Sequence, residues 1–308
     1  MAKKQDNLAA NTRQAVTKHA RWVILGVMLV VCGIASRRVW EGVHQELLDS
    51  PRYKITADTL HLTPEAQPPW IRSDVKAEVL RDSGITNSLT LLDPPATIQQ
   101  RLVDAFELHP WVRKVEQVDL AGPGRIDITI TYREPVAVAE VQTDQARELL
   151  PVDALAVRLP DNELTDVEKS YLPRITTIED RPLVGEAWSD IRMQGAAQLA
   201  DRLRPVWEKY SLLDIVPSTY PEVQRSHRFY TYEIRSSGGT VIRWGAAPGF
   251  SPPGESTFED KLARLAGWIA ANGGLDSINS PESIDVRDSL HVEKRIAKEN
   301  IDDGEQVR

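Results

Sequence analysis

The sequence is poor in the residues that build covalent cross-links and metal sites. Its 308 residues include a single cysteine, Cys32, which lies inside an apolar run near the amino terminus. One cysteine excludes an intrachain disulfide and a cysteine-based metal site. A lipid-attachment site would need a small residue before the cysteine, and Val31 stands there. We therefore interpret Cys32 as one more apolar side chain of the run.

Signatures of enzymatic chemistry are also missing. The six histidines are scattered, and no two have the i, i+4 spacing of a helical zinc site. The chain has no Gly-x-Ser-x-Gly elbow, no phosphate-binding Gly-Lys-Ser/Thr loop and no Gly-x-Gly-x-x-Gly motif. Adjacent carboxylates such as Glu259 and Asp260 are typical of solvated surfaces. We expect no catalytic residue, no cofactor and no metal, which disfavours a membrane-anchored hydrolase.

Positive charge is in deficit over most of the chain. The sequence has 45 acidic against 37 basic side chains and a formal net charge of −8. The exception is the segment 1–21, in which Lys and Arg clearly outnumber Asp and Glu. Nucleic-acid binding needs clustered Lys and Arg, so we do not expect it. By the positive-inside rule, residues 1–21 are expected in the cytoplasm and the bulk of the chain outside it.

The longest apolar run is shorter than the ~20 residues that a transmembrane helix normally needs. It covers residues 22–36, with a tryptophan near each end and arginines on both sides. Tryptophans favour membrane interfaces and arginine side chains can extend to water. We therefore expect an uncleaved transmembrane helix at 22–36, in contact with lipid, and a juxtamembrane stalk at 37–50. The alternative is a cleaved signal peptide, because Gly33-Ile34-Ala35 resembles a small-x-small cleavage site.

A hairpin around residues 118–132 is the clearest structural signal. Ile126, Ile128 and Ile130 alternate with polar residues, so one face of this strand is apolar and the other is expected to be exposed to solvent. The segment before it ends in Ala-Gly-Pro-Gly, a sequence typical of a tight turn. The pattern predicts two antiparallel strands.

Two amphipathic helices and a short strand are expected before the hairpin. Apolar residues recur at helical spacing in residues 98–106 and again in residues 74–82, where Ser73 is the expected N-cap. Tyr53-Lys54-Ile55 is the expected first strand, and residues 61–72 are expected to be a loop. The predicted order is strand, helix, helix, strand, strand.

Two short motifs flank the hairpin and carry a family resemblance. They contain the residues Pro110, Trp111 and Val112 before it, and Arg133, Glu134 and Pro135 after it. Together with the element order, they resemble the POTRA domain of the bacterial cell-division proteins FtsQ and DivIB. The resemblance implies a POTRA domain over residues 51–141. From its residue type alone, Trp111 is expected to be buried bulk rather than a ligand contact.

Residues 142–288 resemble the second, β-rich domain of the same family. Strands are expected at 149–159 and 174–178, and a hairpin at 229–244. A helix is expected at 190–210, where Pro205 should kink the helix or split off its last turn. A second helix, which carries Lys261, is expected at 258–271. Thr257 with Asp260 approximates a capping box for the last helix.

A late strand is the candidate partner site. Its residues, Ser283, Ile284, Asp285, Val286 and Arg287, resemble the family's late Asp-Leu-Arg strand. The resemblance implies a sheet edge that adds a partner strand, with Arg287 contacting an acidic partner segment. Asp288 stands where the family commonly has an aromatic residue. The alternative is an interior strand, or one covered by the charged tail 289–308, which is otherwise expected to be mostly disordered.

The expected fold is α+β: a transmembrane helix, a POTRA domain and a mixed β-rich domain. The resemblance implies a non-enzymatic bitopic scaffold of the division machinery, in the bacterial inner membrane at the septum. Its partners would be small bitopic division proteins of the FtsB and FtsL type and other membrane proteins of that machinery. The alternative is a POTRA-bearing component of outer-membrane protein assembly or secretion. Such proteins usually carry repeated POTRA units and a barrel, which this sequence lacks.

Overall fold

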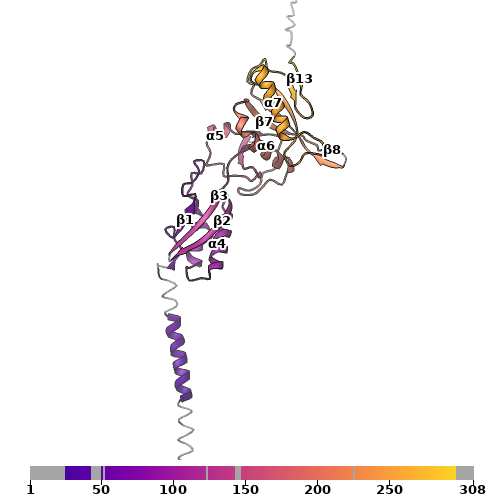
Figure 1. Ribbon diagram of the computed structural model, residues 1–308. Helices are drawn as coiled ribbons and strands as arrows, with labels where there is room; N and C mark the ends of the chain where they lie inside the picture. Colours follow the sequence, from indigo (N-terminus) through magenta and orange to yellow (C-terminus); the bar gives the residue numbers. More distant parts are fainter. Residues whose placement is uncertain are drawn as a thin grey trace, which may run out of the picture.

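The computed structural model describes residues 25–42, 50, 53–122, 124–142, 147–224 and 226–295 (Figure 1). After the amino-terminal helix, the chain forms two successive domains, each built around its own sheet and its own apolar core. The first runs from purple to magenta in Figure 1, and the second continues through orange to yellow.

The prediction of a transmembrane helix at residues 22–36 is wrong for the structure as described. Residues 25–42 form a helix, but within the described segments no helix is long and apolar enough to cross a membrane. The apolar run is short, and this helix continues through Arg37, Arg38 and Glu41, with Arg37 and Glu41 paired at 2.8 Å. Residues 1–24, which include the expected cytoplasmic segment, and most of the expected stalk lie outside the described residues.

The first domain is a three-stranded sheet with helices. In its centre, β3 (Arg125–Tyr132) pairs antiparallel with β2 (Val112–Gly122) and parallel with β1 (Leu60–Thr63). Between β1 and β2 the chain forms three helices: α2 (Val75–Ser83), α3 (Ile85–Ser88) and α4 (Pro95–Glu107). The predicted order of strand, helices and hairpin is therefore present, with one additional short helix.

The first strand lies farther along the chain than predicted. Of the expected strand Tyr53-Lys54-Ile55, only Lys54 makes an isolated bridge, to Thr90, whereas β1 occupies part of the expected loop. A four-residue strand that pairs in parallel with a distant segment has no local sequence signal. Ile55 nevertheless belongs to the core, since its side chain is fully buried.

Local capping explains where α2 begins and ends. The cap is Asp74 rather than the expected Ser73: its carboxylate accepts a hydrogen bond from the backbone N–H of Ala77 at 3.0 Å. Gly84 ends the helix with φ at +64°, a conformation that glycine adopts without strain.

The alternation predicted for β3 is confirmed by burial. Ile126, Ile128 and Ile130 point into a core that also contains Leu102 and Phe106 of α4. The same core includes two leucines, Leu159 and Leu164, that come from well beyond the hairpin in the sequence.

The second domain is an eight-stranded sheet in the order β13-β12-β11-β10-β7-β6-β4-β5. Its strands are β4 (Ala137–Gln142), β5 (Arg147–Val152), β6 (Arg174–Ile175), β7 (Leu212–Pro217), β10 (Thr231–Ser236), β11 (Val241–Ala246), β12 (Ser283–Asp285) and β13 (His291–Glu293). Two further strands, β8 (Glu222–Gln224) and β9 (His227–Phe229), form a separate hairpin that projects from the body as an arm (Figure 1).

Two helices accompany this sheet, α6 (Ile191–Trp207) and α7 (Phe258–Asn272). The short α5 (Asp166–Ser170), between β5 and β6 in sequence, lies between residues that pack on the first domain's core. α6 runs through Pro205 to Trp207, so proline does not split off the last turn. Thr257 caps α7 as expected, accepting a hydrogen bond from the backbone N–H of Asp260 at 3.1 Å.

Both expected limits of the second domain move outward. β4 begins at Ala137, directly after the motif that contains Arg133, so the large sheet starts before the expected boundary at residue 142. At the other end, β13 lies in the tail that was expected to be disordered, and it pairs with β12. Residues 296–308 lie outside the described residues.

The inward face of β3 gives a direct stability test. Replacing Ile128, which is fully buried, by Asp would bury an unpaired charge and should destabilise the protein by about 3–5 kcal/mol. Urea unfolding followed by circular dichroism measures this loss. The control is Thr131→Asp on the exposed face of the same strand, which should cost about 1 kcal/mol or less. Equal effects of the two substitutions would contradict the assigned faces of β3.

Candidate functional site

The residues of the two family-like motifs meet where the two domains join. Trp111 is fully buried, and its indole N–H donates a hydrogen bond to Oε1 of Glu163 at 2.8 Å. Val112 and Pro135 are buried as well. The expectation that Trp111 is buried bulk is confirmed, with one addition: its polar edge is bonded to a residue of the later sequence.

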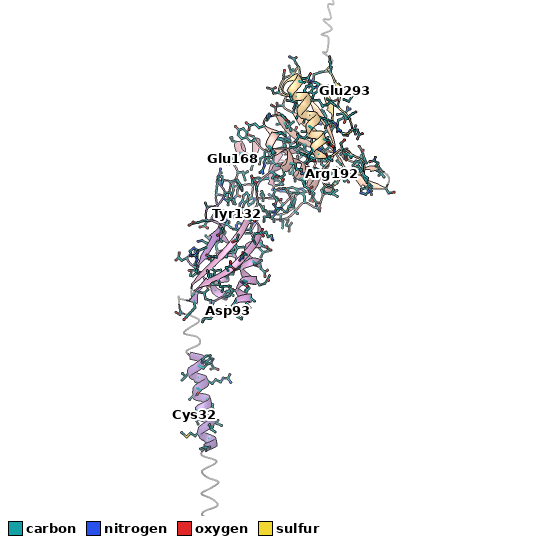
Figure 2. All side chains as sticks on the ribbon, in the orientation of Figure 1. Cys32, Asp93, Tyr132, Glu168, Arg192 and Glu293 are labelled. Carbon is teal, nitrogen blue, oxygen red and sulfur yellow. The ribbon has the colours of Figure 1, made fainter. Side chains whose placement is uncertain are left out.

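Arg133 is tied into the same junction from three sides. Its guanidinium donates to Oδ2 of Asp153 at 2.6 Å, and both side chains are largely buried. Its backbone N–H donates to the carbonyl of Trp111 at 2.8 Å, and its own carbonyl accepts from the indole of Trp70 at 3.0 Å. Next to it, Glu134 forms an ion pair with Arg204 of α6. Figure 2 places Tyr132, at the end of β3, and Glu168, on α5, on either side of this junction.

The expected partner strand is not a free edge. β12 pairs in parallel with β11 and antiparallel with β13. The prediction that the edge itself lies at Ser283–Arg287 is therefore wrong, and the alternative that the tail covers this strand is confirmed. The edge of the sheet is β13, one strand farther out. The strand was found from its sequence, but its position in the sheet depends on a pairing that the local sequence does not encode.

Arg287 is already paired within its own domain. Its guanidinium makes a two-pronged contact with Asp285, with the Nη2–Oδ2 distance at 2.7 Å. This hydrogen-bonded pairing raises the pKa of Arg287. Burial acts to raise the pKa of Asp285, but the hydrogen bonds from Arg287 outweigh it and leave that pKa below its usual range. An acidic partner segment would have to compete with Asp285.

A buried ion pair between α7 and the loop that precedes it lies beside the carboxyl end of β11. Lys261 of α7 is 1% exposed, and its ammonium lies 2.6 Å from Oε1 of Glu255 and 5.8 Å from the ring centre of Trp244. The same carboxylate oxygen accepts from the backbone N–H of Ala246 at 2.9 Å. Gly245 has no Cβ to collide with Glu255, and its φ of +86° suits glycine. The loop after β11 is thus held against the sheet by one buried carboxylate.

One helix residue also fixes the end of β12. Arg264 donates from Nη1 to the carbonyls of Val286 and Arg287 at 2.7 and 3.1 Å, and from Nη2 to the hydroxyl of Ser256 at 3.0 Å. α7 therefore positions both the loop and the carboxyl end of the strand. The sequence pointed to Lys261, but gave no signal for Arg264, Glu255, Asp153 or Glu163, whose partners lie elsewhere in the chain.

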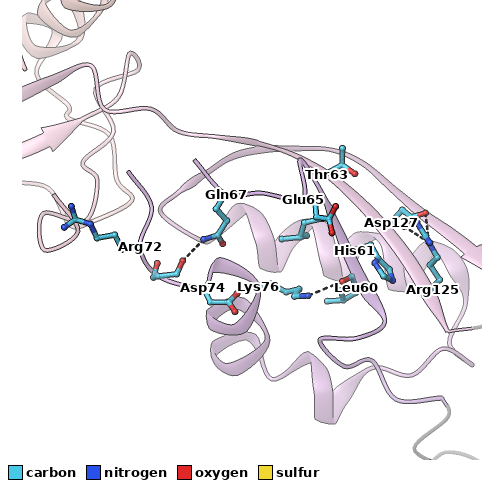
Figure 3. Close-up of a pocket in the computed structure, with 12 residues that line it drawn as sticks. Leu60, His61, Thr63, Glu65, Gln67, Arg72, Asp74, Lys76, Arg125 and Asp127 are labelled. Carbon is cyan, nitrogen blue, oxygen red and sulfur yellow. Dashed lines mark hydrogen bonds and ion pairs between the residues drawn. The ribbon is translucent and has the colours of Figure 1, made fainter. Parts of the chain in front are cut away.

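The two edges of the small sheet differ in how they are covered. On β2, the backbone N–H of Val115 donates to Glu107 at 3.1 Å, and Gln99 donates to the carbonyl of Val118 at 2.9 Å, so α4 occupies that edge. Beside β1 lies a hollow of about 840 Å³. Figure 3 shows it, with Lys76 reaching the carbonyl of Leu60 at 3.4 Å. Apart from Leu62, its remaining lining is polar and mixed in charge.

The described residues contain no group of three or more His, Cys, Asp or Glu side chains placed to hold a metal ion. In comparisons with known proteins, the chain matches no protein-family model and no curated protein. The resemblance to the division proteins therefore depends on the motifs and the element order of the chain itself.

The buried ion pair can be tested by a double-mutant cycle. Lys261→Met keeps the volume but leaves the Glu255 carboxylate buried and unpaired, so it should cost about 3–5 kcal/mol. Adding Glu255→Gln removes that charge and should recover a large part of the loss, as measured by urea unfolding. If the loss of unfolding free energy in the double variant equals the sum of the losses in the two single variants, the pair does not stabilise this end of the sheet through its charges.

Proposed function

We propose that the two domains act as a non-enzymatic scaffold of the bacterial cell-division machinery, related to the FtsQ and DivIB family. The order of strand, helices and hairpin in the first domain supports this, as do the motifs at Pro110-Trp111-Val112 and Arg133-Glu134-Pro135. The proposal concerns residues 50–295 and involves no membrane span. It includes an extracytoplasmic location and accumulation at the division septum.

The observation that carries the proposal is the outer edge of β13, with which no other strand of the described residues pairs. The backbone N–H of Glu282 donates to the carbonyl of Glu293 in β13 at 2.9 Å. The carbonyl of Glu282 accepts from the N–H of Val241, and the N–H of Val286 donates to the carbonyl of Arg243, so Ile284 between them turns its backbone groups toward β11. Ser283 and Asp285 therefore turn theirs toward β13.

The register of β13 then decides which of its groups stay free. Ser283 lies opposite Glu293, and Asp285 lies opposite His291, so these two residues of β13 face β12. The backbone N–H and C=O of Val292, between them, point away from the sheet. An extended segment of another protein can continue the sheet by bonding to this residue.

The surroundings of β13 suit an acidic partner strand. A hollow of about 670 Å³ lies beside it and is lined by Trp268, Asp276, Val292, Lys294 and Arg295, among others. Trp268 and Val292 offer apolar contact. Lys294 and Arg295 give the lining two positive charges against the one negative charge of Asp276, although Arg295 also donates to the carbonyls of Ile278 and Gly238. The proposed partners are small division proteins of the FtsB and FtsL type, held mainly through main-chain hydrogen bonds. Ser283, Ile284, Asp285, Val286 and Arg287 would support this edge from the neighbouring strand, with Arg287 as an additional charge contact.

A proline at the open edge separates binding from folding. Val292→Pro removes an outward-facing N–H and part of the packing of a half-buried side chain, so it should cost about 1–2 kcal/mol of stability, less than the control below. It should reduce co-purification of the partner at least tenfold. Septal accumulation of a fluorescent fusion is the second readout. The matched control, His291→Pro, removes an inward-facing N–H and should lower stability as well.

A charge reversal tests the contribution of Arg287. Arg287→Glu should weaken partner co-purification less than Val292→Pro does, because the side chain only adds to main-chain pairing. Undiminished co-purification by the stable Val292→Pro variant would contradict the proposed edge. Recovery of outer-membrane assembly factors in place of division proteins would favour the alternative function.

A further inference from the structure

A segment of the second domain crosses back to the first domain. After β5, the chain inserts Leu159 and Leu164 into the core of the first domain, where they are 0% and 7% exposed. Leu172, beyond α5, packs against the same core. The first domain is therefore completed by residues that follow the first two strands of the second.

Glu163, between the two buried leucines, makes the more buried polar part of this contact, beside the exposed ion pair of Glu168 with Arg72 at 2.8 Å. Its Oε1 accepts from the indole of Trp111 at 2.8 Å and from the hydroxyl of Ser73 at 3.0 Å. Its Oε2 accepts from the backbone N–H groups of Arg72 and Ser73 at 2.7 and 3.2 Å. Each carboxylate oxygen thus accepts two hydrogen bonds, and all four donor groups belong to the first domain.

The carboxylate is held in its charged form by these contacts. Burial acts to raise the pKa of Glu163, but the hydrogen bonds from Trp111, Arg72 and Ser73 outweigh it and lower that pKa. Without Glu163, the indole N–H of Trp111 would lie in a fully buried side chain with no acceptor. The contact is therefore costly to open.

The position of Glu163 determines what it does. The covalent connection between the sheets runs from Arg133 to Val136, and the contacts of Arg133 with Asp153 and of Glu134 with Arg204 lie on this connection. Contacts on the covalent connection alone would still allow the second domain to rotate about that connection relative to the first. Glu163 reaches beyond this connection, because it bonds to the turn before α2 at Arg72 and Ser73 as well as to Trp111. Hydrogen bonds fix direction where apolar contacts do not.

We infer that Glu163 is an interdomain latch that holds the two domains in one relative orientation. It thereby fixes the geometry between the hairpin tip of the first domain and the β13 edge of the second. A partner that contacts both domains meets a preset surface and does not have to order it on binding. The inference is independent of which partner the protein binds.

The test is an intramolecular distance in the full chain. Nitroxide labels at Ala121→Cys, near the hairpin tip, and Glu208→Cys, after α6, are both on exposed residues. The free cysteine is removed by Cys32→Ser. Pulsed electron spin resonance should give one narrow distance distribution for the latched protein. With Glu163→Ala added, its width should increase at least twofold.

Matched variants keep the outcome interpretable. Glu65→Ala removes an exposed carboxylate of the first domain and should leave the distribution narrow, while Glu163→Gln, which keeps one acceptor oxygen, should give an intermediate width. Should Glu163→Ala prove unfolded by circular dichroism, Trp111→Phe removes one donor of the latch and should broaden the distribution instead. An unchanged width in folded Glu163→Ala or Trp111→Phe protein would overturn the inference.

Discussion

The contacts that buried polar groups make across the junction of the two domains are the interactions on which the rest of the structure depends. Trp111 and Arg133 directly flank the two strands of the first domain's hairpin, yet the indole N–H of Trp111 and Nη1 of Arg133 are bonded to Glu163 and Asp153 of the second domain's sequence. Leaving such groups unpaired would cost about 1–3 kcal/mol each, and more for the charged ones. The motifs that resemble a family signature are thus residues of the interdomain contact.

The far end of the second domain is organised by the same rule. Lys261 and Glu255 are buried together, and Arg264 binds the last carbonyls around β12. These contacts come from α7 and the loop before it, so they hold the sheet end without covering its outer edge. The outcome is a buried support beneath β12, with β13 as the outermost strand of the described sheet, a form that suits addition of a partner strand. The scaffold proposal follows from this combination of a fixed base and an open edge.

The sequence predicted what depends on local patterns. Alternating isoleucines fixed the face of β3, and Thr257 marked the start of α7. It failed for two short strands: β1 pairs in parallel with a distant segment, and β13 is three residues long with one apolar side chain, too short for an alternating pattern. For the candidate site, the strand at Ser283–Arg287 was located, but its cover by β13 could not be. The apolar run at 22–36 was interpreted by its flanks, although its length fell short of a membrane span.

The central claim, that the protein binds its partner through the outer edge of β13, can be tested by amide hydrogen exchange. The exchange of the backbone amide of Val292 would be measured in the full chain, alone and with the division partner bound. The account predicts that this amide exchanges freely in the unbound protein and becomes protected in the complex, while the amide of Ile284 is protected in both. An unprotected Val292 amide in a saturated complex would contradict it.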